Sequence, residues 1–321
     1  MERLLEDAGL SAKVRAVRVS PARSRRRATF SGRRTKKTVQ LGYMAKASDT
    51  LVDINACPLV TPAIEAALPE LRALVPVAAS RRGVVRFMVT ETDTGLDLAI
   101  SGAREVGPEA LAQLGRGPWA RVAWNGEDCL LARAPVVRLG GVEVRLPAEA
   151  FLQATGDGEA ALQAKVLEAL GAVLEGPGPV ADLFCGCGTF ALPLSKHVPV
   201  AAFDAGAEMV AALDEGWRRG TGLKPLRALK RDLFRRPVLA QELARVAGVV
   251  LDPPRAGAAA QVAELAKSAV PVIAYVSCDP ASFARDARAL CAAGFRLDWV
   301  DVVDQFRWSA HVEIAASFRR G

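Results

Sequence analysis

The second half of the chain alternates short apolar runs with segments of helical periodicity. Four runs are typical of buried strands: 180–183, 198–203, 248–251 and 272–276. Helical spacing precedes or separates them at 158–175, 208–218 and 258–267. This alternation predicts an α/β domain with a parallel, doubly wound sheet. The last two strand patterns, 296–303 and 312–318, have no helical pattern between them, so they predict a hairpin that adds an antiparallel strand.

The first 145 residues follow a period of two instead. Alternating residues predict strands at 38–43, 51–54, 84–90 and 96–100. The dipeptides Asn125-Gly126 and Gly140-Gly141 are typical of hairpin turns. Helical spacing at 62–74 predicts a helix with Thr61 as its cap. We therefore expect a smaller, mostly antiparallel α+β domain at 1–145 and an α/β domain at 146–321.

The length of 321 residues agrees with two domains. No apolar run approaches the roughly eighteen residues that cross a bilayer, and the acids in residues 1–10 exclude an ordinary secretory signal. Six cysteines without even pairing exclude a disulfide scaffold, and Cys185 and Cys187 lack the usual spacing of zinc ligands. We expect a cytoplasmic monomer with reduced thiols, no membrane segment and no bound metal.

The net charge of +7 is concentrated near the N-terminus. From Lys13 to Lys37 there is no acid, and eleven residues are basic: Lys13, Arg15, Arg18, Arg23, Arg25, Arg26, Arg27, Arg33, Arg34, Lys36 and Lys37. The rest of the chain is therefore net negative. A charge run by itself is usually a solvated surface, but a basic segment on an acidic body also suits the phosphate backbone of a nucleic acid.

A glycine-rich turn follows the predicted strand at 180–183. Asp182 lies at the end of this strand, and Gly186 and Gly188 precede the next helix. Such a turn lets a ligand approach backbone N–H groups at the carboxyl edge of a parallel sheet. A dinucleotide fingerprint would need a third glycine where Ala191 stands, so the sequence does not support a pyrophosphate cradle.

Acids at three successive strands favour S-adenosylmethionine over a nicotinamide cofactor. Asp182 suits a cationic amino-acid group, Asp204 suits ribose hydroxyls, and Asp232 follows a third strand. Each acid alone could be a helix cap or a turn residue, so the prediction depends on the whole set.

Two later strands end in residues that suit methyl transfer to carbon. Asp252 is followed by two prolines that hold the backbone extended, and Cys278 follows the next strand. An isolated cysteine is more often a small buried hydrophobe. A thiolate at this edge could add to carbon 6 of uracil, so that carbon 5 of the resulting enolate attacks a sulfonium methyl group. Glu313, on the last predicted strand, is the candidate base for the carbon 5 proton, and the alternative is that it is an ordinary exposed strand glutamate.

Five ordered motifs resemble the RNA 5-methyluridine methyltransferase family: Phe-Leu-Gln at 151–153, Asp-Leu-Phe-Cys-Gly at 182–186, Leu-Asp-Pro-Pro-Arg-Ala-Gly at 251–257, Val-Ser-Cys-Asp-Pro at 276–280 and His-Val-Glu at 311–313. The similarity covers nearly the whole chain. It implies a Rossmann-like class I methyltransferase domain beside a smaller RNA-binding domain, with Cys278 as nucleophile and Glu313 as base. Residues at cofactor or active-site positions would be Gln153, Phe184, Asp204 and Asp252.

The resemblance implies RNA as the substrate, and it favours 23S ribosomal RNA over transfer RNA. The target uracil would have to be splayed out of its surroundings to present both faces. The side chains that would hold neighbouring phosphates are Arg25, Arg26, Arg27, Arg33, Arg34, Lys36 and Lys37.

The chain also departs from the family pattern. Many ribosomal members carry an N-terminal β-barrel and a 4Fe–4S cluster, and Cys57 resembles a remnant of the fourth cluster ligand without the other three. We expect no cluster in this chain and a longer N-terminus in the native protein. Thr189 stands where relatives often have asparagine, Asp279 follows the cysteine where asparagine is usual, and Arg-Trp-Ser at 307–309 replaces a proline-containing turn. We expect these departures to bear on substrate choice more than on reaction type.

Three alternatives compete with this interpretation. The first is a uridine-C5 methyltransferase that acts on transfer RNA. The second is an exocyclic-amine methyltransferase, but such enzymes want an aromatic residue where Arg255 stands. The third is an RNA-binding protein that has lost turnover, against which the retention of both Cys278 and Glu313 argues.

Overall fold

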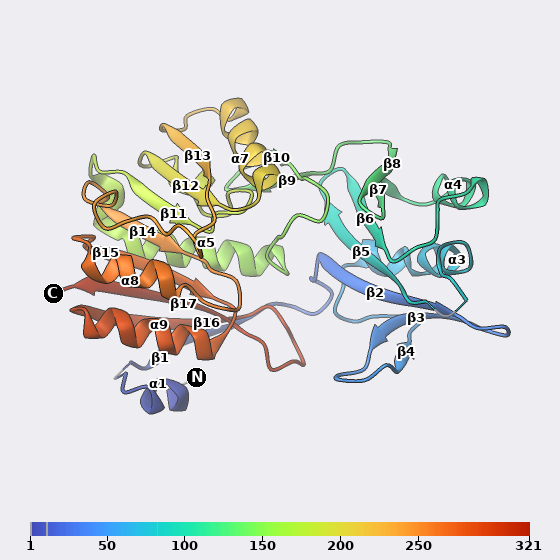
Figure 1. Cartoon of the computed structure of the whole chain (residues 1–321), viewed down its shortest axis with the longest axis horizontal. Coiled ribbons are helices and arrows are strands. Elements are labelled where there is room, and N and C mark those ends of the chain that lie inside the picture. Colours follow the sequence, from blue (N-terminus) through green and yellow to red (C-terminus); the bar gives the residue numbers. More distant parts are fainter. Residues whose placement is uncertain (1, 11, 82) are drawn as a thin grey trace. The chain divides into compact units, whose positions relative to one another are not determined.

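The computed structural model of the chain describes residues 2–10, 12–81 and 83–321, and Met1, Ser11 and Arg82 lie outside the described residues. The chain forms two compact units that interleave along the sequence (Figure 1). Unit 1 consists of Met1–Ser20, Arg138–Val144 and Asp157–Gly321. Unit 2 consists of Pro21–Val137 and Arg145–Gly156.

Unit 1 is built on an eight-stranded sheet in the order β1-β16-β17-β15-β14-β11-β12-β13. The strands are β1 (Val14–Val19), β11 (Val180–Leu183), β12 (Val200–Asp204), β13 (Leu226–Lys230), β14 (Gly248–Leu251), β15 (Val272–Ser277), β16 (Phe295–Asp304) and β17 (Glu313–Arg320). β17 is antiparallel to both of its neighbours, and the other pairs are parallel. The predicted α/β class with an antiparallel last strand is confirmed.

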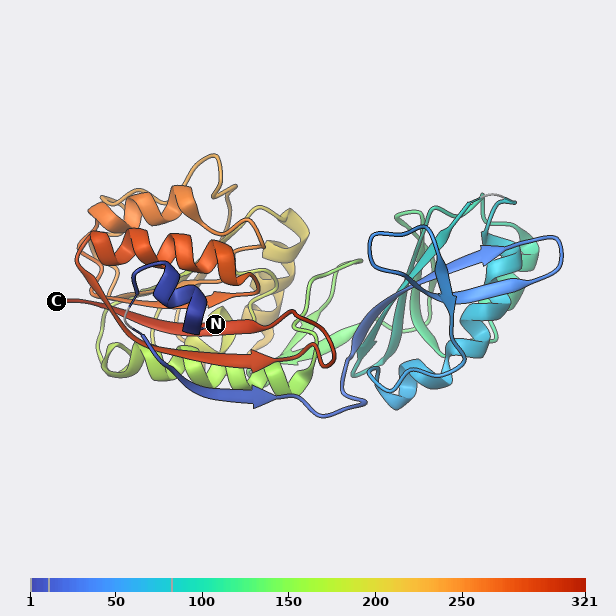
Figure 2. The ribbon, with the colours of Figure 1, turned by 90° about the horizontal axis from the view of Figure 1, so that it is seen from below.

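Helices cover both faces of this sheet. They are α1 (Glu2–Asp7), α5 (Gly156–Leu170), the 3-10 helix η1 (Gly171–Glu175), α6 (Ala191–Leu194), α7 (Ala207–Arg219), α8 (Ala259–Lys267) and α9 (Pro280–Ala292). Figure 2 shows α8 and α9 on one face and α5 on the other. Under α9, the ring of Tyr275 meets Phe283 edge-on at 5.4 Å and lies 6.4 Å from Phe318. Burial of each such ring stabilises the fold by roughly 1.5–3 kcal/mol.

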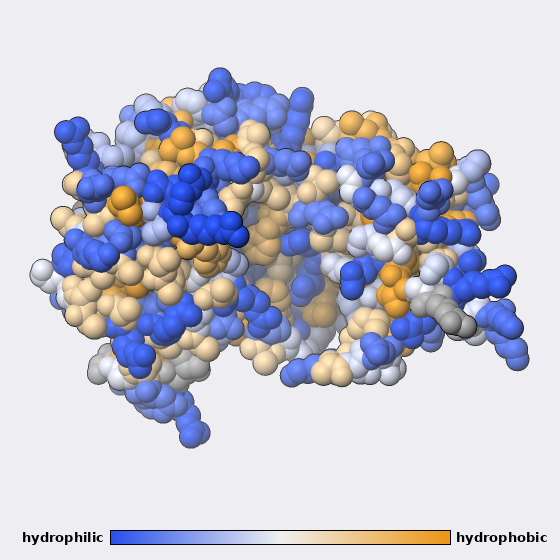
Figure 3. Space-filling model, in the orientation of Figure 1, coloured by the Kyte–Doolittle hydropathy of each residue, from blue (hydrophilic) through white to orange (hydrophobic). Residues whose placement is uncertain are grey.

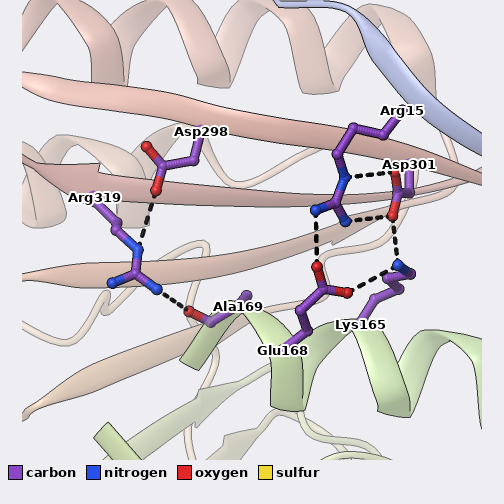
Figure 4. A network of polar contacts seen from close by, with 7 residues as sticks. All are labelled: Arg15, Lys165, Glu168, Ala169, Asp298, Asp301 and Arg319. Carbon is purple, nitrogen blue, oxygen red and sulfur yellow. Dashed lines mark hydrogen bonds and ion pairs between the residues drawn. The ribbon is translucent and has the colours of Figure 1, made fainter. Parts of the chain in front are cut away.

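A network of ion pairs attaches β1 to the rest of unit 1 (Figure 4). Arg15 donates from Nε and Nη2 to the buried carboxylate of Asp301 on β16, at 3.1 and 2.7 Å. From α5, Lys165 lies 2.8 Å from the same carboxylate, and Glu168 accepts from Arg15 at 2.8 Å. These contacts join residues that are far apart in sequence, and they hold β1 against the rest of the α/β sheet.

Unit 2 contains a seven-stranded sheet in the order β4-β3-β2-β5-β6-β7-β8. Its strands are β2 (Arg27–Arg34), β3 (Val39–Met44), β4 (Leu51–Asp53), β5 (Val85–Thr92), β6 (Gly95–Ser101), β7 (Trp119–Trp124) and β8 (Glu127–Leu131), and its helices are α2 (Pro62–Ala66), α3 (Leu68–Ala78) and α4 (Pro108–Leu114). Only the β6–β7 pair is parallel in this sheet. The predicted α+β class is therefore confirmed as well.

The predicted turns are present, but the helix expected at 62–74 is divided. Asn125-Gly126 joins β7 to β8, and Gly140-Gly141 joins β9 (Val136–Leu139) to β10 (Val142–Arg145). α2 ends before Ala67, because Pro69 lacks the N–H that a continuous helix would need and restricts the residue before it. Thr61 occupies the cap position of α2, yet its hydroxyl makes no capping hydrogen bond.

Hydrophilic side chains are spread over the face of each unit that Figure 3 shows, and hydrophobic side chains form small patches between them. In the part of the chain that the structure describes, no helix is both long and apolar enough to span a bilayer.

Candidate active site

The carboxyl ends of the parallel strands in unit 1 meet at one edge of the sheet, which we call the carboxyl edge. Five of these strands, β11 to β15, bring a predicted site residue there, because every parallel strand ends on the same side. β17 runs in the opposite direction, so its first residue reaches the same edge. The residues at this edge are Asp182 and Phe184 from β11, Asp204 from β12, Asp232 after β13, Asp252 after β14, Cys278 after β15 and Glu313 at the start of β17.

The β15–β17 ladder places Cys278 next to Glu313. Its last registered pair is Ser277 with Ile314, and this pair is followed by Cys278, the first residue after β15, and by Glu313, the first residue of β17. The thiol of Cys278 is half-buried, whereas Glu313 is only 3% exposed. The nucleophile and the base that the sequence suggested therefore come from adjacent strands.

Burial and neighbouring negative charge keep both groups protonated at neutral pH. Burial raises the pKa of Cys278 to about 11, with further contributions from Glu313 and Asp252, while Arg255 acts in the opposite direction. Burial, followed by the charge of Asp252, raises the pKa of Glu313 to about 8. A nearby positive charge would lower both pKa values and favour the thiolate and the carboxylate.

Buried and partly buried carboxylates gather at the carboxyl edge. Asp182 is fully buried, and neither of its side-chain oxygens has a hydrogen-bond partner among the described residues. Burial and then the charge of Asp252 raise the pKa of Asp182 well above its usual range. Burial and the charge of Asp204 raise the pKa of Asp252 to about 7. Such a set repels further negative charge and fits a cationic ligand, which is the charge state of S-adenosylmethionine at its sulfonium and amino groups.

Asp204 holds the glycine turn in place. Its carboxylate accepts hydrogen bonds from the N–H of Gly186 at 3.0 Å and of Gly206 at 2.8 Å. Gly188 has a φ of +99°, and a Cβ there would lie 2.4 Å from Leu213, so the turn requires glycine. A carboxylate can accept more than two hydrogen bonds, so Asp204 retains capacity for ribose hydroxyls.

An aromatic pair lines the same edge, and the sequence pattern identified only one of its members. The ring of Phe184, whose φ is +67°, lies 5.5 Å from that of Phe234. Asp232 forms the turn that carries Phe234, since it accepts from the N–H of Phe234 at 3.0 Å and of Arg235 at 3.3 Å. Phe234 remains 48% exposed. Its position two residues after Asp232 is the feature of the sequence from which its place at this edge could have been predicted.

Helix α9 anchors the two loops that carry Asp252 and Cys278. Asp279, directly after Cys278, caps α9 by accepting from the N–H of Ser282 at 2.9 Å. Further along α9, the buried Asp286 accepts from the N–H of Ala258 and from the hydroxyl of Tyr275, both at 2.7 Å.

The loop that follows Asp252 is also held by Arg285. Arg285 donates to the carbonyl of Ala256 at 3.0 Å and to Asp286 at 2.7 Å. Gly257 has a φ of +76°, and a Cβ there would lie 2.8 Å from Asp286. A shift of the loop would therefore break the hydrogen bond from Arg285 to Ala256 and the buried one from Ala258 to Asp286.

The remaining cofactor candidate and the basic candidates lie in unit 2. Gln153 is 2% exposed, and its carbonyl accepts from Nε of Arg26 at 3.1 Å. Arg25 donates to the carbonyl of Arg27 at 2.9 Å, and the Arg27 guanidinium lies 5.5 Å from the Phe151 ring centre. These three arginines are therefore partly engaged within unit 2.

The other basic candidates follow along β2 and its turn. Arg33 donates to the carbonyl of Asp49 at 3.3 Å, and Arg34 donates to the carbonyl of Pro76 at 3.0 Å. Lys36 and Lys37 are exposed in the turn between β2 and β3.

Three other arginines of the basic segment neutralise acids of the protein. Arg15 pairs with Asp301, Arg18 pairs with Asp157, and Arg23 pairs with Glu65. The segment is consequently less available to an anionic ligand than its sequence indicated.

Cys57 is buried, and its sulfur lies 3.5 Å from the hydroxyl oxygen of Tyr43. Among the residues that the structure describes, no group of three or more His, Cys, Asp or Glu side chains could hold a metal ion. His311 contacts the ring of Phe306 edge-on at 6.2 Å in the loop before Glu313.

The chain is similar to known RNA methyltransferases. Residues 228–320 match the family model described as tRNA (uracil-5-)-methyltransferase. An uncharacterised RNA methyltransferase of Rhizobium meliloti (strain 1021) is 44% identical over 320 residues, which cover 98% of this chain and 76% of the relative. The 23S rRNA (uracil(1939)-C(5))-methyltransferase RlmD of Pectobacterium atrosepticum is 31% identical, over 87% of this chain and 63% of the relative.

A solved structure has the same fold. The tRNA (uracil-54, C5)-methyltransferase of Pyrococcus abyssi, in complex with S-adenosyl-L-homocysteine, superposes with a TM-score of 0.76 at 21% identity, over 99% of this chain and 81% of that one. The similarity to the Rhizobium relative over nearly the whole chain identifies the protein as a member of an RNA methyltransferase family, and its residues 228–320 match the model of the uracil-5-methyltransferases.

Proposed function

We propose that the protein methylates carbon 5 of a specific uridine in RNA, with Cys278 as covalent nucleophile and Glu313 as base. The observation that carries this proposal is the register of β15 and β17. It supports a nucleophile and a base on adjacent strands, at the edge where the buried carboxylates gather.

Carbon 5 of uracil is a poor nucleophile until a group adds to carbon 6. In the proposed reaction, Cys278 gives its proton to solvent water and forms a bond from Sγ to carbon 6, and the electrons of the ring double bond move toward carbon 5 and the carbonyl oxygen. Carbon 5 then takes up the methyl group. S-adenosylmethionine supplies that group from its sulfonium sulfur, which becomes a neutral thioether.

Release requires removal of the carbon 5 proton. Glu313 accepts this proton, the electron pair re-forms the ring double bond, and the bond from carbon 6 to the sulfur of Cys278 breaks. The raised pKa of Glu313 means that a positive charge among the carboxylates helps to keep the base ionised. We propose that the residues that bind the cofactor are Gln153, Phe184, Asp204, Asp232 and Asp252.

We further propose that unit 2 binds RNA and that the substrate is 23S ribosomal RNA. The proposed phosphate contacts are Arg25, Arg26, Arg27, Arg33, Arg34, Lys36 and Lys37. The ribosomal target is supported by the name of the Pectobacterium relative, whereas the family model and the Pyrococcus enzyme are named for transfer RNA. Mapping 5-methyluridine in both RNA classes from a deletion strain decides between them.

RNA that contains 5-fluorouridine tests the covalent mechanism. Fluorine at carbon 5 cannot leave as the proton does, so the methylated adduct should accumulate as a complex that survives denaturation. Wild-type protein and the control Cys291→Ala, which changes another half-buried cysteine, should both form it. Cys278→Ala should form none, and an adduct in that variant would exclude Cys278 as the nucleophile.

Ordinary RNA tests the role of Glu313. Glu313→Gln should form the methylated adduct but release product at least ~100-fold more slowly, since general base catalysis contributes about 10²–10⁴-fold. Normal turnover in this variant would assign the base elsewhere. RNA binding without methyl transfer by the wild-type protein would instead indicate a member that has lost catalysis.

A further inference from the structure

An exposed tryptophan occupies the loop between β16 and β17, directly before Glu313. Trp308 is 71% exposed. In the described part of the chain, no residue makes a hydrogen bond, ring contact or cation contact with its indole. Trp119 and Trp124 are at most 4% exposed, and Trp217 and Trp299 are partly buried. Exposure of an indole leaves a large apolar face in water, which is unfavourable unless a ligand covers it.

The backbone at Trp308 is also held in an unfavourable conformation. Its φ is +61°, a region that bulky residues rarely adopt. Strain of this kind persists only where the surroundings enforce it, and it often marks a binding site. The sequence has no glycine or asparagine here, although either would relieve the strain.

Several contacts hold the loop in this shape. The N–H of Phe306 donates to Asp304 at 2.9 Å, and the N–H of Ser309 donates to the carbonyl of Phe306 at 3.0 Å. Arg307 donates from Nε to the carbonyl of Ser20 at 2.7 Å. Both neighbours of Trp308 are therefore fixed, so that its indole is presented on a defined turn rather than on a free chain.

The loop is part of the carboxyl edge. β16 ends and β17 begins there, and Trp308 precedes Glu313 by five residues, which limits their separation to less than about 18 Å. An RNA whose target uridine lies beside Cys278 and Glu313 passes within reach of this side chain. Unpaired nucleobases stack on aromatic faces, and such stacking tolerates any base.

We propose that Trp308 is a stacking platform for an unpaired nucleobase that flanks the target uridine in the RNA substrate. This inference rests on the proposed function in one respect, namely that the ligand is RNA. It assigns Trp308 to RNA affinity and not to the transfer step.

The experiment compares full-length wild-type protein with Trp308→Ala, Trp308→Phe and Leu239→Ala. Leu239 is a hydrophobic residue of unit 1 with 40% exposure, and its neighbour Ala240 donates to Glu264 near the end of α8, away from the carboxyl edge. The binding probe is a fluorescein-labelled oligouridylate measured by anisotropy, and the activity probe is an unmodified 23S ribosomal RNA transcript.

Trp308→Ala should weaken oligouridylate binding and raise KM for the transcript by between about 5-fold and 100-fold, the range expected for loss of one base–aromatic stack. Its kcat at saturating RNA and its affinity for S-adenosylmethionine should match the wild type. Trp308→Phe should retain most of the affinity, and Leu239→Ala should bind like the wild type. RNA should quench tryptophan fluorescence in the wild type and far less in Trp308→Phe.

Unchanged affinity in Trp308→Ala, or loss of kcat without loss of affinity, would overturn the proposal. Failure of the wild-type protein to bind the oligouridylate would also overturn the proposal. Failure of the wild type to methylate any RNA would instead count against the proposed function, while the binding comparison would still decide the role of Trp308.

Discussion

Cys278 and Glu313 owe their acidities to the environment that the sheet edge creates. A half-buried thiol beside a buried carboxyl loses hydration, and the charges of Glu313 and Asp252 further disfavour the thiolate, so its pKa reaches about 11. In the unliganded protein the thiol of Cys278 is therefore protonated at neutral pH and poorly nucleophilic. If Cys278 is the nucleophile proposed above, we infer that the positive charge of the bound cofactor lowers the pKa of its thiol and makes it reactive only in the complex.

The same environment makes the stability of the unliganded protein depend on pH. Glu313 has a pKa of about 8 when folded and an ordinary value near 4.5 when unfolded, so the folded state holds the proton across that interval. The unfolded state binds fewer protons there, and the free energy of unfolding falls as pH rises from about 5 to about 8. Asp252, with a pKa of about 7, contributes in the same direction.

Glu313→Gln should remove much of this dependence, because glutamine mimics the protonated acid. Urea denaturation should show the variant gaining on the order of 1–3 kcal/mol over the wild type at pH 8, with little difference at pH 5. The exposed acid Glu208 on α7 provides a control, and Glu208→Gln should leave the profile unchanged. An equal gain at both pH values would mean that Glu313 is ionised in the folded protein.

Among the residues of the candidate site, sequence patterns identified those at the ends of strands but not those that approach the site from loops. Asp204, Asp252 and Cys278 could be predicted because the end of each strand is visible in the local pattern. The aromatic contact of Phe234 with Phe184 and the effect of Arg255 on Cys278 depend on loop conformations, which local periodicity does not encode.

Helix α9 is the element on which the reactive edge depends most. It begins directly after Cys278, and Asp286 in its interior fixes the loop that follows Asp252. The hydroxyl of Tyr275 on β15 donates to the same carboxylate, so one buried acid connects a helix, a strand and a loop. A substitution of Asp286 should therefore displace both Asp252 and Cys278, although Asp286 itself is in neither of the two loops that carry them.

Asp286→Asn should lower kcat by roughly 10- to 100-fold, since one amide cannot satisfy all the donors around it and a small displacement of the reacting groups has a large effect on rate. Trapping of 5-fluorouridine RNA should slow in parallel, while RNA affinity should not change.

Tyr275→Phe should lower kcat less than Asp286→Asn does. Asp298→Asn, which changes a partly buried acid paired with Arg296 and Arg319, is the control. Thermal unfolding must show that the variants remain folded at the assay temperature, and normal kcat in folded Asp286→Asn would contradict the positioning role.

The elements of the sheet differ in how far the sequence could predict them. β14 and the β16–β17 hairpin follow from local apolar patterns and adjacent positions in the chain. β1 pairs with β16, with Val17 opposite Val302, and no local pattern indicates a partner at that separation. The break between α2 and α3 was missed because helical spacing of apolar residues continues across Pro69.

Only part of the molecule's excess positive charge is available to an anionic ligand. The basic segment has eleven cations, but Arg15, Arg18 and Arg23 are neutralised by acids of the folded protein. Lys36 and Lys37 project from the β2–β3 turn and are exposed. The ion pairs of Arg15 thus stabilise the attachment of β1, whereas the two lysines remain available to phosphates.

These two kinds of cation should respond differently in a salt titration of RNA binding. Each phosphate contact with single-stranded RNA contributes about 0.7 to the slope of log affinity against log salt concentration. Replacing Lys36 and Lys37 together by alanine should lower the steepness of that slope by about 1.4 and weaken binding to all sequences alike. Arg15→Ala should leave the slope unchanged but lower the free energy of unfolding by on the order of 1–3 kcal/mol, because Asp301 is buried and loses a partner. If Arg15→Ala reduced the slope as much as the double lysine variant does, the RNA would be contacting the β1 side of unit 1, and the ion pairs seen there would have to open on binding.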